Sequence, residues 1–461
     1  MRTGIEGFDE HVQSFPKGSL VVVEGEPGTG KTSLCIAFLK AGVESGEKVL
    51  YVSFVESKRD LTNYAKRFNL DLPDLERRGL IRIEEVPTMT QGGGLETLLK
   101  TLLSRVGELN ASRLILDSFT AIRHLFAEEA EVRAFLHNVF LKALKRQGVT
   151  TLMTLEVLGR QRLPVVEEYV ADVILRLRQA YTDEGAFVRE LRIKKFRGTY
   201  LKHTRFCFTL HGGFKLFTKA KEVIDEPLAH EAIDEALKDR ISTGIKSLDE
   251  LLGGGLELGT STLIVYDDWL PVNPLCAVTP AIFQSVMKGR RVMLMPAVGA
   301  QKLSQVLLTS LNEDLLKQGV RALIPAKEEV KNSWITPLKL KLDRDFELMT
   351  NLYFELKRET TGPILMVFDI ASFLRFYGPE SVARLDEALR FAKDRGDVAL
   401  NIVPRSCRFL EEFIAMHDVV LRFYERNETL FLRGIKPPSE SFNFDIYRED
   451  GVRKVRLTPM V

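Results

Sequence analysis

A glycine-rich segment near the start of the chain has the residue types and the spacing to bind phosphate groups. Gly25 to Thr32 reads Gly-Glu-Pro-Gly-Thr-Gly-Lys-Thr, which is the pattern Gly-x-x-x-x-Gly-Lys-Thr. Glycines allow successive backbone N–H groups to turn inward around an anion. Lys31 would contact the β- and γ-phosphates of a nucleoside triphosphate, and the Thr32 hydroxyl would bind Mg²⁺. The predicted nucleotide-binding residues are Gly25, Glu26, Pro27, Gly28, Thr29, Gly30, Lys31 and Thr32.

The residues on either side of this segment predict the elements that hold it. Val21–Val23 are β-branched and suit a buried strand, and the apolar spacing after Lys31 is typical of a helix. The amino-terminal end of that helix would add its positive dipole to the phosphate site. A chance glycine turn between a strand and a helix is the competing interpretation, and the complete spacing argues against it.

Two carboxylates are candidates for the remaining chemistry of a nucleoside triphosphatase. Asp117 ends an apolar stretch, where an acid could hold Mg²⁺, although it could also cap the next turn. Glu56 follows the predicted strand Lys48–Phe54 and is the candidate for orienting the attacking water; a surface glutamate is the alternative. Glu24 and Glu26 are nearer in sequence but would crowd the phosphates with like charge, so they rank lower.

A basic pair later in the chain could contact the γ-phosphate. Lys195 and Arg197 lie two residues apart at the end of the predicted strand Val188–Phe196, so we expect both side chains on one face. A solvated run of charge is the alternative interpretation. The candidate catalytic residues are therefore Glu56, Lys195 and Arg197, and the candidate metal ligands are Thr32 and Asp117.

The chain contains an internal repeat. Residues 3–10, Thr-Gly-Ile-Glu-Gly-Phe-Asp-Glu, are matched by residues 243–250, Thr-Gly-Ile-Lys-Ser-Leu-Asp-Glu, and later landmarks follow in the same order. Apolar strand-like runs alternate with helical patterns, which predicts an α/β fold: two tandem domains, each a mostly parallel sheet flanked by helices. The expected boundaries are domains at 1–218 and 241–436, a charged linker at 219–240, and a tail at 437–461.

The second copy lacks the phosphate-binding residues. At the matching place, residues 266–273 read Tyr-Asp-Asp-Trp-Leu-Pro-Val-Asn, without glycine or lysine and with two acids that would repel phosphate. We therefore expect one nucleotide site per chain.

Composition narrows the class of protein. Apolar residues make up 45% and charged residues 28%, as in a globular protein, and the net charge of +2 gives no overall polyanion-binding signal. The four cysteines are far apart and form no C-x-x-C pair, which predicts neither zinc nor disulfides. With no signal-peptide pattern and no membrane-length apolar run, a cytoplasmic location without membrane contact is expected.

These motifs together resemble the KaiC-like branch of the RecA/RadA ATPase superfamily, in particular its double-domain members. The resemblance rests on residues 3–10, the loop at 25–32, Asp117, the Thr-rich strand at 150–154 and Lys195-x-Arg197-Gly-Thr. It implies tandem RecA-like P-loop domains that bind ATP and Mg²⁺ and form a homo-oligomeric ring, usually hexameric. ATP would lie between subunits, with Lys195 and Arg197 supplied by the neighbour.

One departure from the family affects turnover. Members often carry two adjacent glutamates after the second strand, and here Val55 replaces the first while Glu56 remains. Hydrolysis is therefore expected to be slow, or Glu56 takes over the role. The second domain would brace a ring or bind a regulatory protein partner.

Three functions follow as hypotheses. The first is a Mg²⁺-dependent ATPase that acts as a regulatory or assembly switch. The second is a recombinase-related protein that binds single-stranded nucleic acid through a loop carrying Arg160 and Arg162, where the nearby Glu167 and Glu168 weaken the case. The third is an ATP-binding scaffold that does not hydrolyse ATP.

Overall fold

The structure is a computed structural model. It describes residues 1–86, 94–123, 126, 128–157, 169–182, 185–217, 232–235, 237–295, 307, 311–325, 333–449 and 452–461. Contacts divide the chain into two compact units, here called unit 1 and unit 2. Unit 1 is Met1–Thr218 together with Pro459–Val461, and unit 2 is Lys219–Thr458.

Unit 1 is built on a sheet with the strand order β3-β2-β4-β5-β1-β6-β7-β8-β9. The strands from β3 to β6 pair in parallel, and β6 to β9 pair antiparallel. The bounds are β1 Leu20–Gly25, β2 Val49–Ser53, β3 Ile81–Glu85, β4 Arg113–Asp117, β5 Thr150–Glu156, β6 Val173–Tyr181, β7 Phe187–Phe196, β8 Arg205–Thr209 and β9 Lys215–Leu216. The predicted strands Val21–Val23, Lys48–Phe54 and Val188–Phe196 correspond to β1, β2 and β7. The antiparallel part of the sheet begins at β7, because β6 still runs parallel to β1.

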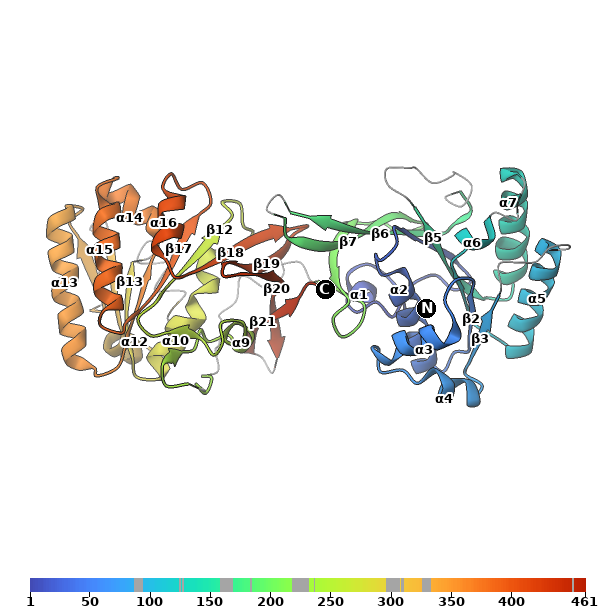
Figure 1. Ribbon diagram of the computed structural model, residues 1–461, viewed down its shortest axis with the longest axis horizontal. Coiled ribbons are helices and arrows are strands. Elements are labelled where there is room, and N and C mark those ends of the chain that lie inside the picture. The colour runs from blue at the N-terminus through green and yellow to red at the C-terminus, as the bar shows by residue number, and fades with distance from the viewer. Residues whose placement is uncertain are drawn as a thin grey trace. The chain divides into compact units, whose positions relative to one another are not determined.

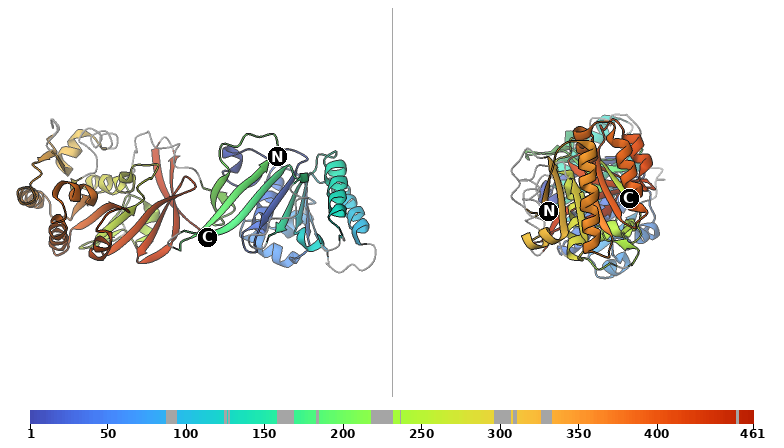
Figure 2. Two further views of the ribbon diagram at one scale, coloured as in Figure 1. Left: turned by 90° about the horizontal axis from the view of Figure 1, so that it is seen from above. Right: turned by 90° about the vertical axis from the view of Figure 1, so that its left-hand side faces the viewer.

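Helices cover both faces of this sheet (Figures 1 and 2). One face carries α1 Phe8–His11, α2 Lys31–Glu44, α3 Lys58–Lys66 and α4 Leu72–Arg77, whose apolar side chains share a core with the strands. The other face carries α5 Gly94–Leu109 and α7 Glu129–Leu136, which continues as the π-helix η1 His137–Leu144. The short helix α6, Thr120–Arg123, follows β4. This layering places the carboxyl ends of β1, β2, β4 and β5 at one edge, which is where ligands bind in such sheets.

Unit 2 repeats the architecture with the strand order β15-β14-β13-β16-β17-β12-β18-β19-β20-β21. The strands are β12 Ser261–Tyr266, β13 Arg291–Met295, β14 Val320–Pro325, β15 Ile335–Leu338, β16 Ile364–Phe368, β17 Val398–Pro404, β18 Val419–Arg426, β19 Thr429–Lys436, β20 Pro438–Glu449 and β21 Val452–Pro459. A separate two-stranded ribbon pairs β10 Arg240–Ile241 with β11 Leu256–Glu257.

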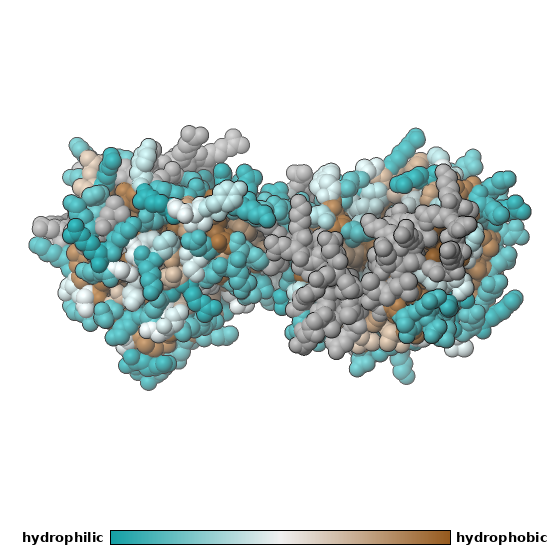
Figure 3. Space-filling model, turned by 180° about the vertical axis from the view of Figure 1, so that it is seen from behind, coloured by the Kyte–Doolittle hydropathy of each residue, from teal (hydrophilic) through white to brown (hydrophobic). Residues whose placement is uncertain are grey.

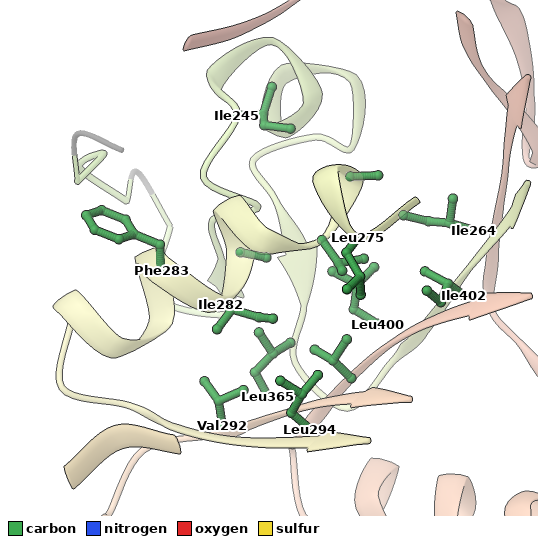
Figure 4. Packing of buried hydrophobic residues seen from close by; sticks show 14 of the residues in the cluster. Ile245, Ile264, Leu275, Ile282, Phe283, Val292, Leu294, Leu365, Leu400 and Ile402 are labelled. Carbon is green, nitrogen blue, oxygen red and sulfur yellow. The ribbon is translucent and has the colours of Figure 1, made fainter. Parts of the chain in front are cut away.

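The helices of unit 2 also lie on two faces. They are α9 Lys246–Leu251, the 3-10 helix η3 Pro274–Ala277, α10 Thr279–Met287 and α12 Glu313–Gly319 on one face, and α13 Leu342–Glu359, α14 Ile370–Tyr377, α15 Ser381–Lys393 and α16 Leu410–Met416 on the other. Figure 4 shows the first of these cores, in which Ile282 of α10 lies over Val292 and Leu365 of the sheet.

The duplication is visible in matched local contacts. Gly18 and Gly259 both have positive φ, 70° and 73°, and each lies two residues before its strand, β1 or β12. Asp172 accepts a backbone N–H from Leu20, and Asp418 accepts one from Ser261. Because these positions match, a residue of β1 corresponds to the residue 241 positions later. The tandem α/β fold predicted from sequence is confirmed.

The end of the chain differs from the expected tail. Residues 437–461 contribute β20 and β21 to the second sheet, and the last three residues belong to unit 1. Most of the expected linker at 219–240 lies outside the described residues. Of its described part, Ile233 pairs with the Gln284 side chain, and Glu235 forms an ion pair with Arg290 within unit 2.

On the face shown in Figure 3, the coloured residues are mostly hydrophilic, with hydrophobic residues in small spots between them. Among the described residues, no helix has both the length and the apolar character needed to span a membrane.

Candidate nucleotide-binding site

The glycine-rich loop connects β1 directly to α2, as the sequence predicts. Gly28 and Gly30 have φ of 76° and 104°, a left-handed conformation that L side chains rarely adopt. A Cβ atom on Gly25 would lie 2.6 Å from Thr29 Oγ1 and 2.7 Å from the Leu177 carbonyl oxygen. The three glycines are therefore required by the shape of the loop.

Lys31 lies at the start of α2 with its ammonium turned back into the loop. Its Nζ donates to the carbonyl oxygens of Gly25 and Glu26 at 2.9 and 3.0 Å. Burial lowers the pKa of Lys31, with smaller opposing effects from Glu156 and Asp117. Among the described residues, no carboxylate lies within ion-pair distance of Lys31 Nζ. A buried ammonium held only by neutral oxygens is electrostatically suited to receive an anionic phosphate.

Asp117 collects three hydroxyl groups from three different elements. Its Oδ2 accepts from Thr32 Oγ1 at 2.9 Å and from the Tyr51 hydroxyl at 2.7 Å, and its Oδ1 accepts from Thr154 Oγ1 at 2.6 Å. Thr32 and Asp117, the two predicted metal ligands, are therefore in direct contact. A carboxylate bonded to the loop hydroxyl is the donor pair that a phosphate-bound Mg²⁺ uses, so the residues fit this ion.

Glu56 lies just beyond β2, next to the strand that ends in Asp117. Its backbone is fixed by Ser53, whose Oγ donates to the Glu56 carbonyl at 2.6 Å and accepts the Glu56 N–H at 3.1 Å. Burial raises the pKa of the Glu56 carboxyl, and the nearby charges of Asp117 and Asp60 raise it further. A carboxylate with a raised pKa is a stronger base than an ordinary glutamate. The adjacent Val55, which stands where family members often carry the first glutamate, is 66% exposed and does not join the core.

Glu24 and Glu26, the two acids ranked lower as bases, have different surroundings. Glu24 is buried in β1, and its Oε1 lies 3.0 Å from Lys194 Nζ and 3.7 Å from Arg176 Nε. Glu26 is exposed, and its carbonyl oxygen accepts from Thr29 Oγ1 at 2.7 Å. Glu24 is therefore paired with cationic side chains rather than placed as a base.

Lys195 and Arg197 lie far from the loop of their own chain. The loop begins at the level of Leu177 in β6, whereas Lys195 pairs with Ile174 and the Arg197 N–H bonds to the Asp172 carbonyl oxygen. At about 3.4 Å per residue these positions are about 10 and 17 Å back along the strand. The side-chain contacts also lie away from the loop. Lys195 Nζ donates to the Tyr169 carbonyl oxygen at 3.3 Å.

Arg197 Nη1 in turn donates to Asp172 Oδ1 at 3.2 Å. The strand ends at Phe196, and a bulge in the β6–β7 pairing falls beside these residues. The structure therefore does not bring the basic pair to Lys31 and Asp117 within one chain.

In unit 2 the matching positions are used for internal contacts. Asp267, which corresponds to Glu26, forms a buried ion pair with Arg422. Val272 corresponds to Lys31, yet the next α-helix begins only at Thr279, seven residues later. Asn273, in the place of Thr32, caps η3 by accepting the Leu275 N–H at 3.0 Å.

The counterparts of Asp117 and of the basic pair have also changed. Asp369 caps α14 by accepting the N–H and hydroxyl of Ser372. The strand pairing matches Lys195 with Lys436 but places Pro438 where unit 1 has Arg197. The segments that carry Arg160, Arg162, Glu167 and Glu168 lie outside the described residues.

Three residues of the site carry no sequence motif. Tyr51 contacts Asp117, and Gln179 and Arg189 donate to the Gly28 carbonyl oxygen at 2.9 and 3.1 Å. For Tyr51, the only signal in the sequence was a tyrosine within a mostly aliphatic strand. The other two become neighbours of the loop only through the pairing of β1, β6 and β7.

A glycine-rich loop between a parallel strand and a helix, with its lysine turned inward and its threonine bonded to an acid two strands away, defines a P-loop nucleoside triphosphate-binding domain of the RecA type. Residues 1–216, just under half of the chain, match the family model described as "ATPase: KaiC".

Curated proteins and a solved structure are similar to part of the chain. The chain is 31% identical over 266 residues to the circadian clock oscillator protein KaiC of Thermosynechococcus vestitus, covering 55% of this chain and 49% of the relative. It is 32% identical over 276 residues to the circadian clock protein KaiC2 of Synechocystis, covering 57% and 46%. The chain therefore spans about half the length of these curated relatives. Among solved structures, a KaiC-like protein of Pyrococcus horikoshii is 29% identical, covers 47% of this chain and 98% of its own, and gives a TM-score of 0.42.

Proposed function

We propose that unit 1 binds ATP with Mg²⁺ and hydrolyses it slowly, and that the nucleotide state acts as a switch for assembly or regulation. The observation that carries this proposal is the buried Lys31 ammonium, which is held by two carbonyl oxygens inside a loop shaped for phosphate. A triphosphate would give this charge the anionic partner that the described residues do not supply.

Each residue of the site has a role in this proposal. Lys31 binds the β- and γ-phosphate oxygens, and the first-turn N–H groups of α2, which have no acceptor within the helix, face the same anion. Thr32 and Asp117 would hold Mg²⁺, which supplies charge neutralisation on the phosphates when bound. Glu56 orients the attacking water, and its raised pKa suits a base.

Lys195 and Arg197 are proposed to act on a neighbouring copy of the chain. Their distance from the loop along β6 and β7 excludes a role in their own site without rearrangement of the sheet. A head-to-tail contact that places them against the next loop would repeat around a closed ring, and we propose a hexamer in line with the family resemblance.

Unit 2 is proposed to be a RecA-like domain that has lost nucleotide binding. Its loop positions are occupied by an internal ion pair between Asp267 and Arg422, and its helix starts too late to present N–H groups to a phosphate. We propose that it braces the assembly or offers a surface to a regulatory protein, with one nucleotide bound per chain.

Titration calorimetry with ATP and Mg²⁺ tests binding, and phosphate release tests turnover. We expect one ATP per wild-type chain, loss of binding in Lys31→Ala, and unchanged binding in Lys40→Ala, a lysine of the same helix that bonds to the Phe68 carbonyl instead. Absence of binding to wild type, or two equivalent sites per chain, would overturn the proposal. Phosphate release no faster than that of Lys31→Ala would remove the hydrolase part.

A further inference from the structure

The carbonyl group of Gly28 in the P-loop is held by two side-chain donors. It accepts from Gln179 Nε2 at 2.9 Å and from Arg189 Nη1 at 3.1 Å. The N–H of the same peptide belongs to Thr29 and donates to the Glu26 carbonyl at 3.3 Å. Both ends of this peptide are therefore fixed, with the carbonyl oxygen bonded to the sheet.

The orientation of this peptide matters for binding an anion. A phosphate cradle needs N–H groups turned inward, and a carbonyl oxygen turned toward the phosphates would repel them. Glycine at this position can rotate easily, because it lacks the Cβ that restricts other residues. The two side-chain donors thus select the peptide orientation that accepts a nucleotide.

Arg189 is itself held by a segment more than 260 residues away in sequence. Its Nε donates to the Val461 carbonyl oxygen at 2.7 Å, and its backbone N–H lies 3.4 Å from the Met460 sulfur. Residues 459–461 are further fixed on unit 1 by Thr209 Oγ1, which donates to the Pro459 carbonyl at 2.8 Å. One guanidinium therefore connects this segment, continuous with β21, to the P-loop.

The surroundings of Arg189 limit the positions that its guanidinium can adopt. The guanidinium lies over the Phe187 ring at 5.1 Å, and burial lowers the pKa of Arg189. A partly desolvated guanidinium with two carbonyl acceptors has a defined position, and loss of one acceptor allows it to turn toward water. The seating of residues 459–461 is thereby linked to the placement of the donor on Gly28.

We propose that Arg189 is a positioning residue through which residues 459–461 tune the affinity of the P-loop for a nucleoside triphosphate. This inference rests on the proposed function, since it concerns the same site. Gln179 holds Gly28 independently, because within the described part of the chain it bonds to the loop and not to the segment. The segment strengthens nucleotide binding when it is seated and weakens it when it is displaced.

The test is a cycle of variants of the full chain, measured by calorimetric Kd for ATP with Mg²⁺. We expect about 5- to 20-fold weaker binding after deletion of residues 459–461, the same loss in Arg189→Ala, and no additional loss in the combined variant. Gln179→Ala should instead multiply its effect with that of the deletion. Arg178→Ala is the matched control, because this neighbouring arginine forms an ion pair with Glu190.

A second variant keeps the chain length intact in case the deletion disturbs folding. Thr209→Val removes the hydroxyl that donates to Pro459 and should reproduce part of the loss of affinity in wild-type Arg189, but none in Arg189→Ala. Unaltered ATP affinity in a folded deletion variant and in Thr209→Val, or multiplicative losses for the deletion and Arg189→Ala, would overturn the inference while leaving the proposed function intact. Failure of wild type to bind ATP would overturn both.

Discussion

Asp267 and Arg422 form a buried ion pair at the place in unit 2 that corresponds to the P-loop of unit 1. The exposed fractions of the two residues are 5% and 2%, so neither charge is hydrated. The pair provides an internal negative charge where unit 1 is shaped for a phosphate, and it gives the altered loop a structural function of its own.

Replacing Asp267 by Asn should destabilise the chain without creating a second nucleotide site. Because the change leaves Arg422 buried without this acidic partner, we expect a loss of about 3–5 kcal/mol in the free energy of unfolding. Denaturant unfolding measures this loss, and calorimetry should still give one ATP per chain. The control is Asp268→Asn, an exposed neighbour that bonds to Ser406, for which a change below about 1 kcal/mol is expected. Equal stability of the two variants would contradict this assignment.

The raised pKa of Glu56 predicts that hydrolysis is sensitive to mild acid. The deprotonated carboxylate is the active form of a base, so the rate should fall as pH decreases through a pKa above the ordinary glutamate value. Glu56→Gln should lower kcat by about 10²-fold or more and leave the Kd for ATP within a few-fold of wild type. Steady-state phosphate release against pH gives both results. A variant with wild-type kcat would show that another residue positions the water.

Mixing two inactive variants tests whether Lys195 and Arg197 act on a neighbour. Lys31→Ala retains the basic pair but lacks a working loop, and Arg197→Ala retains the loop but lacks the arginine. If the pair acts between chains, mixed assemblies contain some complete sites, so phosphate release should recover to a fraction of the wild-type rate. The matched control pairs Lys31→Ala with Glu56→Gln, whose defects lie in the same site and should not complement. Sedimentation of each sample with ATP checks that assemblies form.

His417 predicts a pH dependence of stability that originates in unit 2. Burial lowers the pKa of its imidazole to about 4, while Nδ1 contacts the Phe413 carbonyl oxygen and Nε2 contacts the Asn401 amide nitrogen. Below the unfolded value of about 6.5 the proton binds the unfolded chain preferentially. Stability should therefore be constant above that pH and fall by about 3 kcal/mol as pH decreases toward 4.

Denaturant unfolding between pH 7 and 4 checks this expectation. His417→Gln should lose the component that titrates in this window, whereas His211→Gln, at an exposed histidine, should retain it. The same pH slope in wild type and His417→Gln would assign the effect to other groups.

The motif of the candidate site could be recognised from sequence because it is local. Gly25, Gly30, Lys31 and Thr32 lie within eight residues, and their spacing follows directly from the geometry of a loop around phosphate. Asp117 was a candidate because it ends an apolar strand, but a capping role like that of Asp369 could be distinguished only by its contact with Thr32. The internal repeat predicted the second sheet in the same way.

The remaining contacts depend on which strands become neighbours, and sequence order does not reveal this. Gln179 and Arg189 reach Gly28 because β6 lies beside β1 and β7 beside β6. Residues 437–461 mix charged and apolar side chains without a clear period, yet they form β20 and β21 because β19 offers an edge for pairing. Tyr51 is a buried polar group whose partner is fixed only by packing.

The placement of Lys195 and Arg197 at the opposite end of β6 from Gly25 has a consequence for how activity scales. If each complete site needs residues from two chains, an isolated chain is inactive. The hydrolysis rate per chain then rises with protein concentration until rings are complete. A single defective copy would then silence its own centre and impair the adjoining one, so damage would spread beyond the copy that carries it.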